Sequence, residues 1–356
     1  PSFAMAAYWD LLNRHAFGNY RELLEAITLN PAMGAYLNTR GNQKANAAGR
    51  VPDENYAREV MQLFSIGLYE LNPDGTLRGG APRETYGLAD VSNLARVFTG
   101  YKLNETSRES ETNPEPFRRP MKLDAALHAS DAVTVLGQNI AAGDGTARLR
   151  QALDILFNHA NVGPFIGRQL IQRLVTSNPS AAYVGRVAAA FNNNGAGVRG
   201  DLRAVTRAVL LDPEARQGDE RNGPAWGKLR EPMIRFVQWA RTFGAISSDG
   251  QWILWNLSDA STSLGQNPLR SPSVFNFFRP GYVPPGTALA DRQQPAPEFQ
   301  ITNENSVAGY LNYIQSVIAY GAYGSSTSKI WVENYTREMA LVRDTGALVD
   351  RVNLLL

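Results

Sequence analysis

The sequence contains no cysteine, and this absence excludes disulfide bonds, iron–sulfur clusters, a thiolate nucleophile and cysteine-ligated zinc. Only three histidines are present, and no two of them have the spacing of an H-E-x-x-H zinc motif. A nucleophile elbow, a P-loop and a dinucleotide fingerprint are also missing. The longest apolar runs fall far short of the ~20 residues that a membrane-spanning helix needs. A net charge of +2 supplies no field that would attract nucleic acid or anionic lipid.

What the chain does contain is a recurring helical spacing of apolar residues. With 356 residues, of which 44% are apolar, it can bury a substantial core. The clearest pattern begins near Asp53 and ends at the turn 72–75, with apolar positions three and four apart at Tyr56, Val60, Leu63, Phe64, Gly67 and Leu71. Further helical patterns cover 86–99, 147–158, 164–176, 181–192, 201–211, 231–243, 303–321 and 329–355.

The best β segment covers residues 131–140, where Leu136-Gly137-Gln138 predicts the turn of a small hairpin. The sequence therefore predicts a mainly α fold, an irregular multi-helix array with a small β-hairpin. We expect a single helical domain over residues 1–356, with its softest internal boundary in the polar loop 104–120. Helical pattern begins directly after Pro1 and continues to the last residues, so we interpret the sequence as a fragment of a longer chain.

Three charged residues near the start of the clearest helix are candidates for chemistry. Glu54 and Arg58 are four apart and can form an ion pair on one helix face. Glu59 points about 140° away from Glu54, so the two carboxylates cannot form a glycosidase dyad from this helix alone. Glu59 lies beside the apolar stripe and needs a partner, such as Arg96 from the next helix. A single buried Glu59 could also act as an acid or base if burial raises its pKa.

His128 and Asp131 lie three residues apart beside the predicted hairpin. They could share a hydrogen bond, share a metal or orient a general base, and with Glu59 they form the candidate catalytic set. Anchoring of the loop is the alternative interpretation. The histidines predict no metal site, because a histidine-only zinc centre would need all three to converge.

Calcium is the one cofactor that the sequence leaves open. The segment from Glu70 to Thr76 resembles the start of a calcium loop, with oxygen ligands at the first, third and fifth positions and glycine at the sixth. The twelfth position is Ala81 instead of the bidentate glutamate that closes such a site. A plain turn after a helix explains the segment better.

Aromatic residues gather in the proline-rich stretch 262–300. Phe275, Phe278 and Tyr282 could line a groove for a sugar or a peptide, and Arg279 adds a charge. Packing as a lid on the helical core is the alternative. These four residues are the candidate binding residues.

Several stretches, taken together, resemble a known family. They are PDENYAREVMQLFSIGLYELNPDGT (52–76), NLARVFTGY (93–101), HASDAVTVLG (128–137), NHANVGPFIGRQLIQRLVTSNPS (158–180), DLRAVTRAVLLDPEAR (201–216), GKLREP (227–232) and GQNPLRSPSVFNFF (265–278). The chain is similar in this order of motifs to the bacterial family called domain of unknown function 1800, without its N-terminal portion. The family often has His-Pro where this chain has His159-Ala160, so the resemblance fixes no role for that position.

The resemblance implies a mostly helical, exported bacterial protein, located in the periplasm, outside the cell or at its surface. It also implies a genomic neighbour of the domain of unknown function 1501 family, which looks phosphatase- or sulfatase-like, as a candidate partner. The family has no settled activity and transfers no catalytic residue. We expect a partner-binding or assembly protein. The alternative is a hydrolase or lyase that acts on an extracellular polymer through Glu59, His128 and Asp131.

Overall fold

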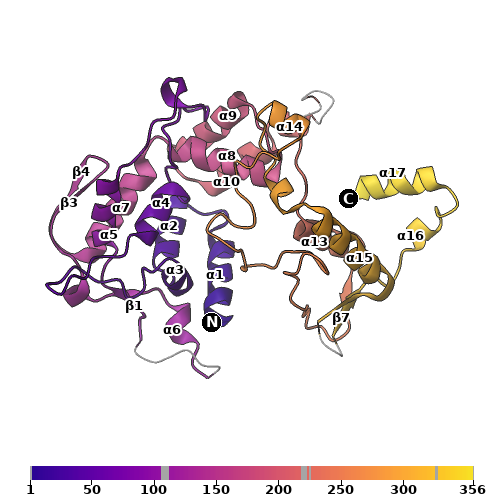
Figure 1. Ribbon diagram of the computed structural model, residues 1–356, viewed down its shortest axis with the longest axis horizontal. Coiled ribbons are helices and arrows are strands. Elements are labelled where there is room, and N and C mark those ends of the chain that lie inside the picture. Colours follow the sequence, from indigo (N-terminus) through magenta and orange to yellow (C-terminus); the bar gives the residue numbers. More distant parts are fainter. Residues whose placement is uncertain (1, 106–111, 218–222, 224–225, 325–327, 356) are drawn as a thin grey trace. The chain divides into compact units, whose positions relative to one another are not determined.

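The chain is mainly helical, with only small two- and three-stranded sheets, as the sequence predicts (Figure 1). The computed structural model describes residues 2–105, 112–217, 223, 226–324 and 328–355. Two compact units divide the chain, Pro1–Trp226 and Gly227–Leu356. The loop 104–120, which the sequence marks as the softest boundary, belongs to the first unit, and its residues 106–111 lie outside the described residues.

The first unit holds most of the helices. They are α1 (Ser2–His15), α2 (Tyr20–Thr28), α3 (Pro31–Tyr36), α4 (Asn55–Gln62), α5 (Leu88–Val97), α6 (Glu115–Arg118), α7 (Gly145–Asn158), α8 (Val162–Leu174), α9 (Ala181–Asn192), α10 (Leu202–Leu210) and α11 (Pro213–Arg216), with 3₁₀ turns η1 (Arg78–Gly80) and η2 (Ala125–Leu127). Two antiparallel pairs accompany them, β1 (Tyr101–Lys102) with β2 (Lys122–Leu123) and β3 (Val133–Val135) with β4 (Gln138–Ile140).

The predicted hairpin forms at the predicted turn. Val135 pairs with Gln138, so the loop consists of Leu136 and Gly137 alone. Both residues have positive φ, 50° and 74°, which is the twist that a two-residue hairpin loop requires. The Leu136 N–H also donates to the carboxylate of Asp90, and this bond ties the hairpin to α5.

Backbone hydrogen bonds join two segments of the first unit that lie far apart in the sequence, 18–20 and 200–202. Tyr20 N–H donates to Gly200 O at 2.7 Å, and Leu202 N–H donates to Gly18 O at 2.9 Å. Asn19 caps α2 through its side chain and also donates to Arg199 O. The first turns of α2 and α10 are therefore fixed to each other across about 180 residues of chain.

The helix that begins near Asp53 is shorter than predicted. The pattern predicts a helix to Leu71, but α4 ends at Gln62. Gly67, with φ +72°, forms a turn directly after the helix and donates its N–H to Met61 O. A side chain at position 67 would also meet the Phe165 ring at 2.7 Å. Beyond Gln62, Ile66 and Gly67 are buried and Phe64 is half-buried, so part of the apolar spacing faces the core although the helix has ended.

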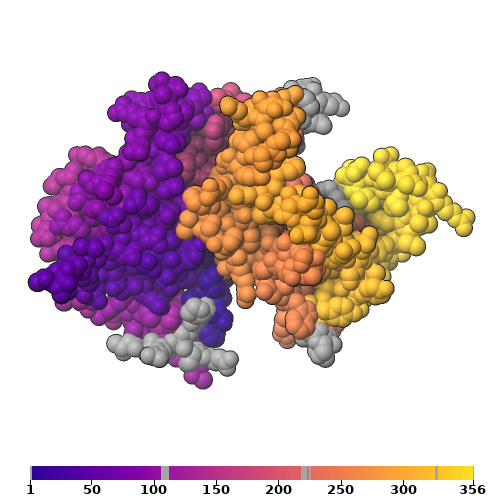
Figure 2. Space-filling view, viewed as in Figure 1, coloured from indigo at the N-terminus to yellow at the C-terminus, as the bar shows by residue number. Residues whose placement is uncertain are grey.

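The second unit is built around two helices and a small sheet. Its elements are α13 (Pro232–Thr242), α14 (Ala288–Asp291), η3 (Pro297–Ile301), α15 (Glu304–Tyr320), α16 (Thr336–Met339) and α17 (Thr345–Leu355), with β5 (Ile246–Ser247), β6 (Ala322–Tyr323) and β7 (Lys329–Trp331) in the antiparallel order β5-β7-β6. Its core contains Phe236, Trp239, Leu257, Leu264, Val317, Ala322 and Ile330. No described residue of α16 or α17, yellow in Figure 2, is buried.

The prediction of one helix over 329–355 is wrong. The segment begins as β7, whose residue Ile330 pairs with Ser247 and Ala322, and only then forms α16 and α17. Both strand partners are supplied by other parts of the chain, so the local helical spacing does not reveal them. None of the described helices combines the length and the apolar character needed to cross a bilayer.

Candidate functional site

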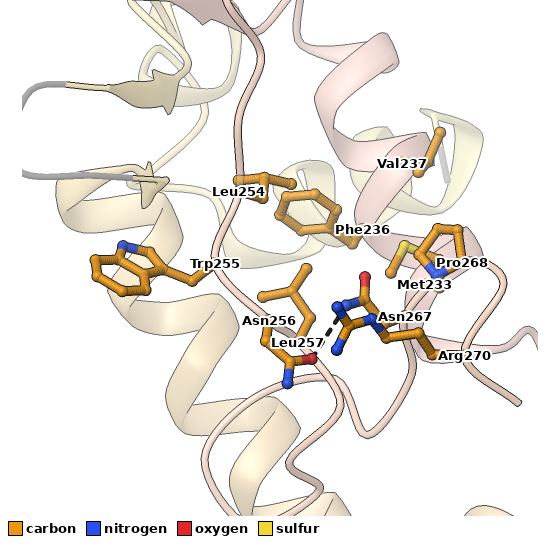
Figure 3. Close-up of a pocket in the computed structure, with 10 residues that line it drawn as sticks. All are labelled: Met233, Phe236, Val237, Leu254, Trp255, Asn256, Leu257, Asn267, Pro268 and Arg270. Atoms are coloured by element: carbon orange, nitrogen blue, oxygen red, sulfur yellow. Dashed lines mark hydrogen bonds between the residues drawn. The ribbon is translucent and has the colours of Figure 1, made fainter. Parts of the chain in front are cut away.

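A pocket of about 370 Å³ lies on the second unit (Figure 3). Its lining comes from α13 and from two loop segments that follow it: Met233, Phe236, Val237, Leu254, Trp255, Asn256, Leu257, Asn267, Pro268 and Arg270. Apolar side chains dominate, and the polar ones are two asparagines and an arginine. Figure 3 shows the Trp255 ring directed away from the other labelled side chains, at the rim of the pocket.

A buried glutamine holds the loop segment against α13. Gln266 accepts the Met233 N–H at 3.1 Å and donates to the Glu231 carboxylate at 2.7 Å. Its own N–H donates to Leu257 O at 3.1 Å. The Gln266 side chain is 2% exposed, so these bonds form away from water, where they hold geometry most firmly. Gln266 thus fixes two lining residues, Met233 and Leu257, relative to each other.

The other wall of the pocket is an extended segment. Trp255 donates its N–H to Tyr323 O at 3.2 Å, which fixes the segment beside β6. Asn256 accepts a hydrogen bond from Asn267 at 3.0 Å, drawn dashed in Figure 3. Trp255 is 62% exposed, and its neighbours Trp252 and Ile253 are also exposed. The pocket therefore opens beside a short apolar surface.

The polar groups that line this pocket are two amides and a guanidinium. Its ten lining residues include no aspartate, glutamate or histidine, so none of them can transfer a proton near neutral pH. An apolar floor with a few fixed hydrogen-bonding groups is typical of ligand pockets. Among the described residues, no three histidine, aspartate or glutamate side chains are grouped so that they could hold a metal ion.

His128, one of the candidate catalytic residues, lies buried in the first unit with both ring nitrogens occupied. Nδ1 is 2.9 Å from Thr99 O and Nε2 is 2.8 Å from a guanidinium nitrogen of Arg148. A carbonyl can only accept and a guanidinium can only donate, so these contacts require the neutral ring with its proton on Nδ1. Burial lowers the pKa of His128, and the charge of Arg148 lowers it further.

The guanidinium of Arg148 is itself buried, and backbone carbonyls surround it. It donates to Ala129 O and to Asp131 O as well as to His128. Its position thus connects α7 to the loop before the hairpin. Two glycines make room for this arrangement. A side chain at Gly145 would meet the His128 ring at 2.9 Å, and one at Gly100 would meet the His128 backbone.

Asp131 is placed beside His128 through its backbone, while its carboxylate points elsewhere. The carboxylate lies 3.1 Å from Arg96 and is largely exposed. Arg96 is thus the partner of Asp131, not of Glu59 as the sequence suggests. The structure therefore brings His128 and Asp131 together around Arg148.

Glu59 is buried on α4, with 8% of its surface exposed, and its Oε2 has no hydrogen-bond partner. Burial raises the pKa of Glu59, and the positive charge of Arg58 opposes that rise. The negative charge of Glu59 also acts on Tyr86 and adds to the rise in the pKa of Tyr86 that burial causes. No hydrogen bond or ion pair joins the described Glu59 side chain to His128 or Asp131. The catalytic role of the three residues stays a prediction.

The environment of Glu59 gives a testable pH effect. Because its pKa is raised in the folded state, the ionised carboxylate destabilises the fold above that pKa, and protonation at lower pH removes the penalty. We expect Glu59→Gln to raise the free energy of unfolding on the order of 1 kcal/mol at pH 8. The gain should shrink as the pH falls. Urea unfolding at several pH values measures it.

Glu54→Gln is the matched control on the same helix. The Glu54 carboxylate lies 3.5 Å from Arg58 and also accepts a hydrogen bond from Ser92. Loss of its charge therefore removes favourable contacts, and we expect no gain in stability. A Glu59→Gln variant that is less stable than the parent at pH 8 would contradict the argument.

The predicted binding residues 275–282 form contacts within their own loop. Phe278 is buried, with 2% of its surface exposed, and Arg279 lies over the Phe275 ring at 5.3 Å. Tyr282 donates its N–H to Arg279 O and accepts from Ala296 N–H, which closes the loop. None of the four lines the pocket of Figure 3. Their role in binding stays a prediction.

The oxygens of the predicted calcium loop bind within the protein. Asp74 accepts from both the N–H and the hydroxyl of Thr76, and Asn72 donates to the same hydroxyl. These bonds lower the pKa of Asp74. Glu70 lies 3.4 Å from Arg83 and 3.8 Å from Arg78. The segment has the hydrogen bonding of a tight turn.

The structure is that of a mainly helical protein with a pocket in its second unit that no acidic side chain lines. The chain belongs to the family described as protein of unknown function (DUF1800), whose family model matches residues 1–356. The match confirms the resemblance seen in the sequence motifs. No curated protein matches the chain, and no solved structure matches it.

The pocket residues were only partly accessible to sequence reasoning. Asn267, Pro268 and Arg270 fall in the stretch 265–278 that carries the family resemblance, but the aromatic residues at its other end are the stronger sequence signal for binding. Trp255 lies outside every motif, and its spacing follows no helix or strand period. A tryptophan in a run of other large apolar residues between polar turns was the available signal.

Proposed function

We propose that this chain is a partner-binding protein whose second unit receives an apolar anchor of another protein. The observation that carries the proposal is the composition of the pocket: an apolar floor, three polar side chains and no acid or histidine. Tryptophan and arginine are among the residue types that dominate binding energy at protein interfaces. The Trp255 ring and Arg270 supply both here.

The arrangement suits a segment that places one apolar side chain on the floor. Asn256 and Asn267 stand in fixed positions because they bond to each other and to the loop backbone. Asparagine amides can donate to and accept from the main chain of a bound segment. Meanwhile the ring nitrogens of His128 are engaged, and Asp131 is paired with Arg96. These contacts favour binding over acid–base catalysis.

The partner that we propose is a protein of the domain of unknown function 1501 family, and the location is outside the cytoplasm. Both follow from the family, whose members are commonly exported and encoded beside such proteins. A stable complex between two exported proteins agrees with a pocket that offers affinity and no proton transfer.

We expect Trp255→Ala to weaken the complex at least tenfold, because the substitution removes the large apolar contact that the tryptophan ring makes with the partner. The neighbouring protein of the 1501 family and the full-length chain are purified separately, and calorimetric titration gives the dissociation constant. Trp9→Ala is the matched control, since Trp9 is 50% exposed but lies on α1 of the first unit.

The two variants separate the outcomes. Weakening by Trp255→Ala with no change by Trp9→Ala supports the pocket as the docking site. Equal affinity of all three proteins would place the contact elsewhere, and failure of the wild-type pair to bind would remove the proposed partner.

A further inference from the structure

A second, polar cavity of about 460 Å³ lies on the first unit, between the end of α9 and the start of α10. Asn193, Asn194, Asp201, Arg203 and Arg207 face it, and no large apolar side chain lines it. The first unit's polar cavity is thus different in chemistry from the pocket of the second unit. The hydrogen-bond donors and acceptors of this cavity that are not engaged within the protein decide which ligand fits it.

The side-chain acceptors of this cavity are already used. Asn193 Oδ1 accepts from the N–H of Gly195 at 2.9 Å and from that of Gly197 at 3.0 Å. Asn194 Oδ1 accepts in the same way from the N–H groups two and four residues further along the loop. The two asparagine oxygens therefore shape the loop and have little capacity left for a ligand.

The single carboxylate in the cavity is also engaged. Asp201 Oδ1 caps α10 by accepting from Arg203 N–H and Ala204 N–H, and its Oδ2 accepts from the Asn194 amide at 2.7 Å. The Asn194 bond is the main cause of a lowered pKa of Asp201, and the backbone bonds add to it. The carboxylate thus stays ionised, and its two oxygens are occupied by bonds to the first turn of α10 and to Asn194.

The unused groups of the cavity are donors. Arg203 and Arg207 are exposed and lie four residues apart on α10, so their like charges repel each other. Neither guanidinium forms an ion pair with any residue that the structure describes. The amide nitrogen of Asn193 adds a further donor at the rim. A ligand that fits this cavity must bring acceptors and negative charge.

We propose that the cavity binds an oxyanion group, the phosphate or sulfate of an ester, between Arg203 and Arg207. The planar fork of a guanidinium matches two oxygens of such a group, and two forks on one helix face can hold it from two sides. Binding relieves the repulsion between the arginines. The loop that begins at Asn193, held by its own asparagine bonds, supplies Asn193, Asn194 and Gly195 to the lining beside them.

Titration of the purified chain with inorganic phosphate and with sodium sulfate, at constant ionic strength, tests the proposal. Calorimetry gives the dissociation constants. The double variant Arg203→Gln, Arg207→Gln should weaken binding at least tenfold. The control Arg337→Gln, Arg343→Gln makes the same charge change at exposed arginines of the second unit and should leave binding unchanged.

Saturable binding of either anion that only the first double variant loses supports the site. Absence of saturable binding to the wild-type chain overturns it. Equal weakening by both double variants also overturns it, because the effect is then one of net charge. If the double variant does not fold, Arg207→Gln alone, which leaves the capping turn of α10 intact, takes its place under the same criteria.

Discussion

Replacement of Gly100 by alanine is expected to lower the free energy of unfolding of the first unit by about 3 kcal/mol or more. Gly100 has φ +86°, where a side chain costs about 1–2 kcal/mol. The added methyl group would also lie 2.8 Å from Asp124 O and 3.1 Å from the His128 N, both backbone atoms that cannot turn away. Urea unfolding measures the loss, and hydrogen exchange of α5 assigns it to this unit.

Gly137→Ala is the control for the cost of placing a side chain at positive φ without steric contacts. Gly137 has a similar φ of +74°, yet an added side chain would meet nothing within 4 Å. We expect only the conformational penalty there, about 1 kcal/mol. If both variants lose the same stability, the crowding around His128 is not what requires glycine at position 100.

Replacement of Arg148 by leucine should be comparably damaging, with an expected loss of about 3 kcal/mol or more. Leucine leaves His128 Nε2 and the Ala129 carbonyl buried without this donor, and it also removes the part-buried bond to Asp131 O. The stabilising contact is the directed hydrogen bonding of the guanidinium, so Arg148→Lys should recover little of it. Chemical unfolding of the two variants beside the parent measures the difference.

Arg150→Leu is the matched control on the same helix. Arg150 is 62% exposed and pairs with Glu25 at 3.2 Å, a contact expected to contribute less than about 1 kcal/mol. An Arg148→Leu protein as stable as Arg150→Leu would show that the buried carbonyls find other partners, and the role assigned to Arg148 would fail.

The sequence predicts the helices well where apolar spacing and end signals coincide. Asn19 and Asp201 begin helices as capping residues, and the 131–140 hairpin turns at Leu136-Gly137. The spacing of the apolar residues after Gln62 misleads, because successive turns of a folded loop can face the core at the same intervals as a helix. The end of α4 depends on Gly67 and on its contact with Phe165, which the local pattern does not contain.

The prediction of a helix over 329–355 is wrong for a related reason. Its first residues become a strand because β5 and β6 supply edges to pair with, and that pairing is a property of the whole second unit. The residue pattern of a short segment does not reveal which distant segment it pairs with.

The candidate site could be predicted only in part. Residue type and spacing drew attention to His128, Asp131 and Glu59, but the engagement of the His128 ring by Arg148 depends on α7, which comes later in the chain. Likewise, Trp255 becomes a rim residue only because Tyr323 fixes its backbone. The geometry of both places comes from bonds between distant segments, which composition and motif spacing do not encode.

The backbone bonds that link Gly18 and Tyr20 to residues 200–202 also constrain the order of events during synthesis. A ribosome that adds about 5–20 residues per second needs about 10–40 s to extend the chain from the first of these segments to the second. During that interval the start of α2 lacks its final neighbour. The amino-terminal helices therefore complete their docking only after nearly the whole first unit has been translated, and a truncation before residue 200 leaves them open to proteases and chaperones.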